Sequence, residues 1–249
     1  MYPVIIDNVS KNFGFTKAVN RISLTLRQGE ILGCLGTNGA GKTTTIKMML
    51  GFIAPDSGKI EVFGGDPRQA LARRRIGYMP EAAYYYPYLN AYELLTFYGG
   101  VCGMERSVIR KRAGELLERV GLGDAAGRLL RTYSKGMLQR AGIAQSLLHD
   151  PDLLILDEPL TGLDPLARIQ FRDMITELRD QGKTVFFSSH ELSEAELICD
   201  RVAIIKHGEL VLCDTVDAVA GDGGQNLERV FLKTLEETQG ETGGEEVAR

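Results

Sequence analysis

The sequence lacks any stretch that could cross or enter a membrane. No window approaches the roughly 20 consecutive apolar residues that a membrane-spanning helix needs. The first residues, MYPVIIDNVSKNFG, have neither the basic flank nor the long apolar segment of a signal peptide. These absences predict a cytoplasmic protein, so that any work at a membrane would require a second chain that crosses it.

Cysteine is scarce and shows no pairing pattern. Cys34, Cys102, Cys199 and Cys213 form no C-x-x-C pair and have no metal-ligand spacing, which suits a reducing cytosol. Cys34 lies in an apolar, strand-like run, where we expect a buried thiol.

Charge of one sign is not concentrated in the chain. The 29 Lys and Arg residues and 33 Asp and Glu residues give a net charge of −4, which argues against a dedicated nucleic-acid-binding protein. With 249 residues, 44% of them hydrophobic, the chain can bury a sizeable core as one large domain or two small lobes.

The stretch GTNGAGKTT, residues 36–44, has the spacing of a phosphate-binding loop. Gly36, Gly41, Lys42 and Thr43 match G-x-x-x-x-G-K-[ST], and the motif lies between a strand-like run, EILGCLG, and a helical one, KTTTIKMML. We therefore predict that Lys42 reaches the β- and γ-phosphates of a nucleotide and that Thr43 ligates Mg²⁺. The remaining predicted nucleotide-binding residues of this loop are Thr37, Asn38, Gly39, Ala40 and Thr44.

Two more polar segments follow runs that are typical of buried strands. In LLILDE, Asp157 can hold Mg²⁺ through water, and Glu158 can polarise an attacking water. In FFSSH, His190 falls at the strand edge where open α/β sheets bind ligands. Taken alone, LLILDE would indicate a strand followed by a helix-capping acid, and His190 would indicate a packed side chain. The presence of the phosphate loop favours the catalytic interpretation of both.

A second glycine-containing turn, RTYSKGMLQR at residues 131–140, precedes another helix-favouring run. Such a turn also presents backbone N–H groups to an anion at a helix N-terminus. One domain would then carry two phosphate cradles.

Hydrophobic periodicity predicts an α/β fold. Residues 4–35 are rich in strand patterns, residues 82–132 in helical ones, and from residue 151 onward buried-strand runs alternate with amphipathic helices. The last dozen residues are polar and glycine-rich, which predicts a disordered tail.

With these motifs in this order, residues 4–215 resemble the nucleotide-binding subunit of an ATP-binding cassette (ABC) transporter. The resemblance implies a P-loop NTPase cassette: a RecA-like core, an N-terminal antiparallel β subdomain and an inserted α-helical subdomain at about residues 82–150. It implies one ABC ATPase domain at residues 1–220, followed at residues 221–249 by a short helix and an acidic tail.

The resemblance also implies individual roles, with ATP and Mg²⁺ as cofactors. Phe13 would stack on adenine, and Asp164 in TGLD would belong to a loop that contacts a second cassette. The predicted catalytic residues are Lys42, Glu158 and His190, the metal ligands Thr43, Asp157 and Glu81, and the signature-loop residues Ser134, Lys135 and Gly136.

The partners implied by the resemblance would explain the two cradles. In this family two cassettes meet head to tail, and each ATP lies between one phosphate loop and the other subunit's signature loop. We expect a homodimer rather than a heterodimer, a separate polytopic membrane permease, no nucleic acid, and a peripheral position on the cytoplasmic face of the membrane. The segments YSKGM, MPE and LERVFLKTLEE resemble the branch that serves exporters of drugs, antibiotics or polysaccharides.

Two other kinds of protein would share part of this set of motifs. A soluble ABC protein acting on ribosomes or in cofactor assembly would share the ATPase motifs. A small-molecule phosphotransferase would use the phosphate loop alone and would leave the signature loop and His190 unexplained.

The aromatic run YYYPYL, residues 84–89, could equally be a packed turn or a docking surface for a membrane subunit.

Glu81 stands where the family has a glutamine, so three carboxylates would repel one another when the metal is absent. We predict that ATP binding by the wild-type chain depends more strongly on Mg²⁺ than binding by a Glu81→Gln variant. Titrating ATP at several Mg²⁺ concentrations measures this, and identical curves for the two proteins would contradict it.

Overall fold

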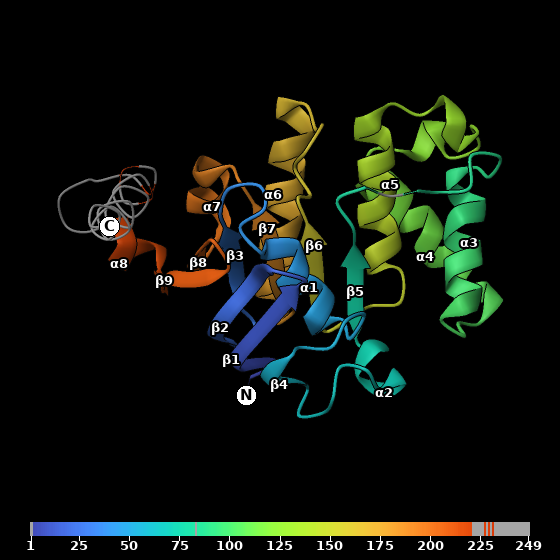
Figure 1. Ribbon diagram of the computed structural model, residues 1–249. Coiled ribbons are helices and arrows are strands. Elements are labelled where there is room, and N and C mark those ends of the chain that lie inside the picture. Colours follow the sequence, from blue (N-terminus) through green and yellow to red (C-terminus); the bar gives the residue numbers. More distant parts are fainter. Residues whose placement is uncertain (1, 83, 221–226, 228, 230, 232–249) are drawn as a thin grey trace, which may run out of the picture.

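Two β-sheets organise the chain, as the computed structural model in Figure 1 shows for residues 2–82, 84–220, 227, 229 and 231. The smaller sheet is antiparallel, with strand order β2-β1-β4, and the larger has the order β5-β6-β7-β3-β8-β9. All neighbours in the larger sheet are parallel except β8 and β9. The strands are β1 (Val4–Phe13), β2 (Thr16–Leu26), β3 (Ile31–Leu35), β4 (Ser57–Val62), β5 (Ile76–Met79), β6 (Leu153–Asp157), β7 (Thr184–Ser189), β8 (Arg201–Lys206) and β9 (Glu209–Thr215).

Alternate residues of the central strands enter two different cores. Phe187 of β7 lies in a core shared with helices, whereas its neighbour Phe186 packs toward the antiparallel sheet. Leu154 and Leu153 of β6 divide in the same way. Successive side chains of a strand point to opposite faces, so a strand covered on both faces must be apolar throughout, as these strands are.

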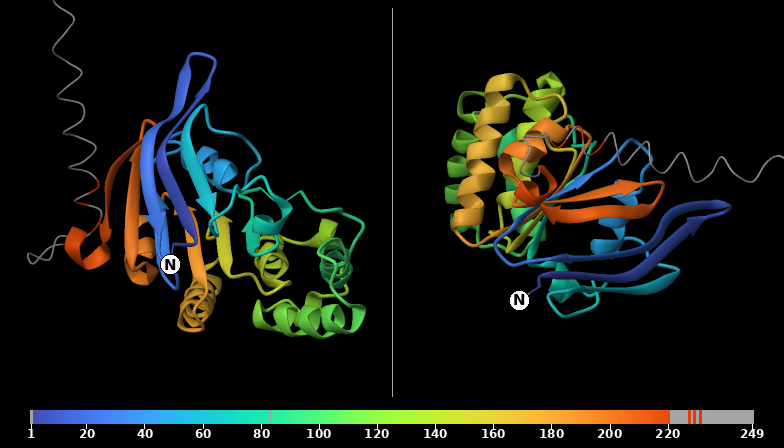
Figure 2. Two further views of the ribbon diagram at one scale, coloured as in Figure 1. Left: turned by 90° about the horizontal axis from the view of Figure 1, so that it is seen from below. Right: turned by 90° about the vertical axis from the view of Figure 1, so that its left-hand side faces the viewer.

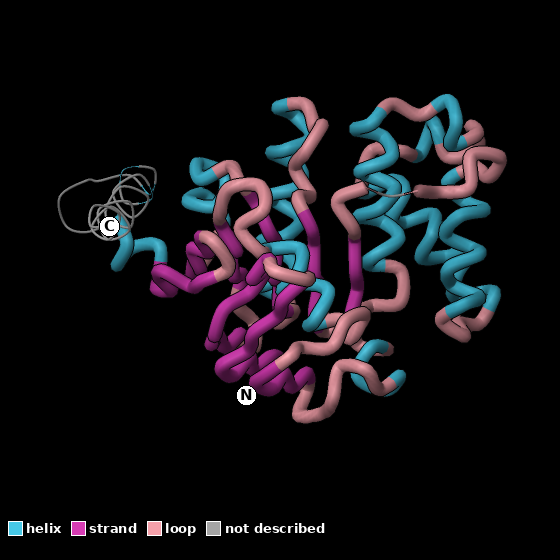
Figure 3. The backbone as a smooth tube through the Cα atoms, in the orientation of Figure 1, coloured by secondary structure: helices cyan, strands magenta, loops and turns pink. Residues whose placement is uncertain are grey.

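The helices fill the spaces around the larger sheet. They are α1 (Lys42–Met49), α2 (Ala70–Arg73), α3 (Ala91–Val101), α4 (Arg106–Arg119), α5 (Lys135–Leu147), α6 (Pro165–Asp180), α7 (Leu192–Ile198) and α8 (Val216–Ala220), with 3₁₀ turns at Gly123–Ala125 and Leu130–Thr132. Helices α3, α4 and α5 gather beside β5, at the far side of the molecule from β9 (Figure 3). These three helices lie within the predicted insertion at about residues 82–150, while residues 84–90 form no helix.

Local signals place the ends of several helices. Asn90 and Glu93 form a reciprocal capping box at the start of α3, with hydrogen bonds of 2.8 and 2.9 Å. Gly51, with a φ of 69°, follows the end of α1, where the left-handed backbone suits glycine.

The predicted fold class is confirmed, as is the burial of Cys34. Burial raises the pKa of the Cys34 thiol to about 12. Within the residues that the structure describes, no helix is both long and apolar enough for a membrane span. The predicted division into residues 1–220 and a tail at 221–249 stays a prediction, because the expected C-terminal helix and tail fall almost entirely outside the described residues.

Candidate functional site

The phosphate loop joins the end of β3 to the start of α1. A Cβ added at Gly36 would lie 2.4 Å from the carbonyl oxygen of Ile205, and one at Gly41 would lie 2.5 Å from that of Ala18. Gly41 also has a φ of 112°, a conformation that other residues rarely adopt. Glycine is therefore required at both positions for this loop to close against β2 and β8.

Lys42 is held inside this loop with only 6% of its surface exposed. Its Nζ donates a 2.6 Å hydrogen bond to the carbonyl oxygen of Gly36 and lies 3.3 Å from Glu158 Oε1. The ammonium group is thus fixed at the mouth of the loop, between its backbone and the acid at the end of β6.

Asp157 and Thr43 bring two oxygen ligands together from different elements. Thr43 Oγ1 donates to Asp157 Oδ1 at 3.3 Å, and Ser188 Oγ donates to the same oxygen at 2.6 Å. A hydroxyl and a carboxylate are ligands that suit Mg²⁺, which prefers oxygen. The donor set fits the predicted metal, and Ser188 fixes the orientation of its carboxylate.

Glu158 has a backbone conformation that is unusual for its residue type. Its φ is 50°, in the left-handed region that costs about 1–2 kcal/mol for residues with a Cβ. Ser188 Oγ accepts a 2.9 Å hydrogen bond from the Glu158 amide, and His190 Nδ1 lies 2.8 Å from Glu158 Oε2. The other carboxylate oxygen, Oε1, is buried and has no hydrogen-bond partner among the described residues. The Lys42 ammonium lies 3.3 Å from this oxygen, which still has room to accept a hydrogen bond.

A cleft of about 400 Å³ is lined by Lys42, Thr43 and Glu158. Asp157, Ser188 and His190 are not among its lining residues. The predicted residues that line it are Thr37, Asn38, Gly39, Ala40, Gly41, Lys42, Thr43, Thr44, Glu81 and Glu158. The cleft is therefore formed by the phosphate loop, the acid after β6 and the acid after β5.

Phe13 does not line this cleft. It is half exposed at the end of β1, in the hairpin that projects from the body (Figure 2), with the Lys11 ammonium 5.7 Å from the centre of its ring. Phe15, at the turn of the same hairpin, is fully exposed. The role predicted for Phe13 therefore stays a prediction.

The signature-loop residues Ser134, Lys135 and Gly136 do not line this cleft. Ser134 caps the N-terminus of α5, where its hydroxyl accepts a 3.2 Å hydrogen bond from the Met137 amide, and Lys135 is exposed beside it. Helix α5 lies with the helical group next to β5, whereas α1 follows β3 (Figure 1). Strands β5 and β3 are separated by β6 and β7, which places roughly 14 Å of sheet between them. The phosphate loop and the predicted second cradle therefore lie on connections between different strands of the chain.

Comparison with known proteins assigns the family. A family model described as ABC transporter matches residues 19–161, which is more than half of the chain. The chain belongs to the ABC transporter family.

Relatives of this cassette include named ATP-binding proteins. It is 48% identical over 219 residues to the uncharacterised ABC transporter ATP-binding protein all4389 of Nostoc, covering 85% of this chain and 65% of that protein. The linearmycin resistance protein LnrL of Bacillus subtilis is 39% identical, with 93% of this chain and 75% of that protein covered. The daunorubicin/doxorubicin resistance protein DrrA of Streptomyces peucetius is 41% identical, with 89% and 68% covered. The cassette thus spans less than two thirds of the all4389 protein.

A solved structure of an ATP binding subunit of an ABC transporter has the same fold. It matches with a TM-score of 0.86 at 28% identity, covering 93% of this chain and 99% of that one.

Several residues of the cleft and its supports were not predicted from the sequence. Lys17, Ala18 and His207 line the cleft from the β1–β2 and β8–β9 regions, and Thr16 does so beside them. Ser188 holds both Asp157 and Glu158. The glycine pattern marks the phosphate loop alone, whereas these residues reach the cleft through pairings of distant strands that no local motif indicates.

The tyrosine run divides between the two alternatives, and Tyr85 follows the packed-turn one. Tyr85 packs against the helical core, and burial raises its pKa, so it is the packed residue of the turn. Tyr84, by contrast, is 96% exposed, and Tyr86 and Tyr88 are also exposed. The Tyr86 ring lies 5.7 Å from that of Tyr88 and 5.8 Å from that of Phe97. We call Tyr84, Tyr86, Tyr88 and Phe97 the aromatic patch.

Ser188→Ala should raise the Mg²⁺ concentration needed for half-maximal ATP hydrolysis by about tenfold, because the hydroxyl that orients Asp157 is removed. A Mg²⁺ titration of the ATPase rate measures this. Ser146→Ala removes another buried hydroxyl, one that bonds only within α5, and should leave the requirement unchanged. An unaltered Mg²⁺ requirement in Ser188→Ala would show that this hydroxyl does not support the metal site.

Proposed function

We propose that this cassette binds and hydrolyses Mg·ATP and thereby powers a membrane exporter. The observation that carries the proposal is the arrangement of Lys42, Glu158 and His190 at the mouth of the phosphate loop. Lys42 Nζ and His190 Nδ1 lie within 3.3 and 2.8 Å of the two oxygens of the Glu158 carboxylate. Positive and hydrogen-bonding groups thus surround one acid at the point where a terminal phosphate would enter.

Each group then has a chemical task. Thr43 and Asp157 would hold Mg²⁺, which when bound neutralises charge on the phosphate oxygens. Glu158 accepts a proton from the attacking water at Oε1, an oxygen that is ion-paired with Lys42 Nζ at 3.3 Å but accepts no hydrogen bond among the described residues. Lys42 and His190 donate hydrogen bonds to the charge that develops on the phosphate.

The separation of the two cradles supports a dimer as the working unit. The α5 N-terminus lies with the helical group beside β5, and β6 and β7 separate that strand from β3, which leads into the phosphate loop of the same chain (Figure 1). A second cassette placed head to tail would supply its Ser134, Lys135 and Gly136 to that loop. Lys135 is exposed, so its positive charge is available to a nucleotide held by another chain.

The exporter part of the proposal rests on the relatives. LnrL and DrrA are named for resistance to linearmycin and to daunorubicin and doxorubicin. By analogy, the cassette would serve a separate polytopic permease from the cytoplasmic face of the membrane, with a drug or antibiotic as cargo. A soluble ABC ATPase with no membrane subunit is the alternative, and the partner that co-purifies with the cassette distinguishes the two.

Glu158→Gln should lower the rate of ATP hydrolysis by about a hundredfold or more while retaining ATP, since the amide cannot accept the proton. Lys42→Ala should weaken ATP binding by about tenfold or more, because a buried charged donor is lost. Single-turnover hydrolysis and equilibrium ATP binding measure the two effects. Lys47→Ala, an exposed lysine of the same helix, is the matched control. Hydrolysis by Glu158→Gln at the wild-type rate would contradict the assignment of Glu158 as the proton acceptor.

The aromatic patch is the surface we propose for the membrane subunit, since exposed aromatic side chains are enriched at protein interfaces. Tagged Glu158→Gln cassette, incubated with Mg·ATP and solubilised native membranes, should recover a polytopic membrane protein. Adding Tyr84→Ala and Tyr88→Ala should reduce that recovery, whereas Phe15→Ala, an exposed aromatic on the projecting hairpin, should not. Full recovery by the tyrosine variants would exclude the patch, and ribosomal or assembly proteins in place of a membrane protein would favour the soluble alternative.

A further inference from the structure

Gln139 is a buried polar residue that the proposed chemistry does not use. It lies in the second turn of α5, five residues after Ser134, and is only 4% exposed. Its Nε2 donates hydrogen bonds of 3.1 Å to the carbonyl oxygen of Glu158 and 3.2 Å to that of Pro159. The side chain thus connects the helix of the signature loop to the backbone of the proposed catalytic acid in the same chain.

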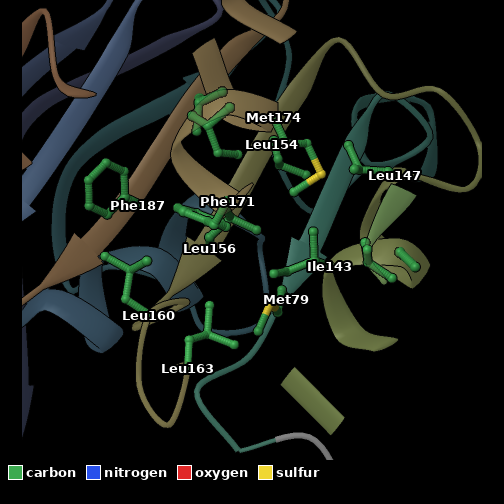
Figure 4. Close-up of a cluster of buried hydrophobic side chains, with 14 of the residues drawn as sticks. Met79, Ile143, Leu147, Leu154, Leu156, Leu160, Leu163, Phe171, Met174 and Phe187 are labelled. Atoms are coloured by element: carbon green, nitrogen blue, oxygen red, sulfur yellow. The ribbon is translucent and has the colours of Figure 1, made fainter. Parts of the chain in front are cut away.

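The signature loop also contacts the segment that follows Glu158. A Cβ added at Gly136 would lie 2.8 Å from the carbonyl oxygen of Gly162, and one at Gly162 would lie 3.0 Å from the side chain of Lys135. Farther along α5, Ile143 shares one buried cluster with Leu160 and Leu163 (Figure 4). Lys135, Gly136 and Gln139 of α5 therefore lie against residues 158, 159 and 162.

The backbone of Glu158 is fixed from two sides. The hydroxyl of Ser188 accepts from its amide, and the carboxamide of Gln139 donates to its carbonyl. Because the φ of Glu158 is 50°, its left-handed conformation depends on such external partners. Displacing α5 would move Gln139, one of these two hydrogen-bond partners, and would thereby change the direction of the Glu158 carboxylate.

We propose that Gln139 is a positioning residue that couples the signature loop to Glu158 of the same chain. The inference rests on the proposed function. In a head-to-tail dimer, the signature loop of one chain faces the nucleotide held by its partner. Glu158 of that first chain acts on the nucleotide held by its own phosphate loop. Gln139 then transmits a shift of α5 at one composite site to the hydrolytic acid of the other.

Gln139→Met is the direct test, because methionine keeps the length of the side chain and removes both donors. We expect kcat for ATP hydrolysis to fall by about tenfold to a hundredfold, as a small misplacement of a reacting group can produce. KM for ATP should stay within about twofold, since binding groups are untouched. Gln145→Met makes the same change six residues farther along α5 and should retain wild-type kcat and KM.

A double-mutant comparison identifies the route of the effect. If Gln139 acts through Glu158, adding Gln139→Met to Glu158→Gln should cause no further fall in the residual rate. The unfolding midpoint and equilibrium Mg·ATP binding of Gln139→Met should match those of the wild-type chain.

Three results would overturn the inference. One is an unaltered kcat in Gln139→Met, and another is a full additional loss in the Glu158→Gln background. The third is a joint fall of kcat, Mg·ATP binding and unfolding midpoint, which would make Gln139 a residue of the core alone. Absence of hydrolysis by the wild-type chain would instead overturn the proposed function, and the inference with it.

Discussion

The parallel register of the larger sheet is the constraint on which the candidate site depends. Strands β3, β6 and β7 run side by side in one direction, so their carboxyl ends meet at one edge. Gly36 follows β3, Glu158 follows β6 and His190 follows β7. Residues more than 100 positions apart in the chain thereby come within hydrogen-bonding distance, as the 3.3 Å contact of Thr43 with Asp157 illustrates. Ligands of open α/β sheets bind at this edge for the same reason.

The same sheet keeps the phosphate loop and the predicted signature loop next to different strands of one chain. In the strand order β5-β6-β7-β3, two strands separate β5 from β3. Helix α5 packs beside β5, whereas α1 follows β3. In the proposed dimer, a second cassette would bring its signature loop to this phosphate loop. Within one chain the two regions communicate through the segment 158–163, which carries the proposed catalytic acid at one end and contacts Lys135, Gly136 and Gln139 along its length.

Local sequence pattern predicted those parts of the site that it alone determines. The phosphate loop is defined by glycines that the backbone needs at fixed spacings, and continuous apolar runs predict strands covered on both faces, as β6 and β7 are. It failed where contacts depend on tertiary structure. Ser188 and Gln139 carry no motif, and Lys17 and His207 reach the cleft only through distant strand pairings. Tyr84 and Tyr85 are identical neighbours in the sequence, yet one is exposed and the other packed, because only the folded helical group decides which side faces the core.

The central claim is that a complete site forms only between two chains, and complementation tests it most directly. Lys42→Ala disables the phosphate loop and keeps the signature loop, whereas Ser134→Ala combined with Lys135→Glu, at two exposed positions, does the reverse. A mixed dimer of the two would contain one site with both loops intact and one with neither. The account predicts that a mixture of the two inactive proteins hydrolyses ATP, although neither does so alone. A mixture with no more activity than the sum of its components, under conditions where the wild-type chain is active, would contradict it.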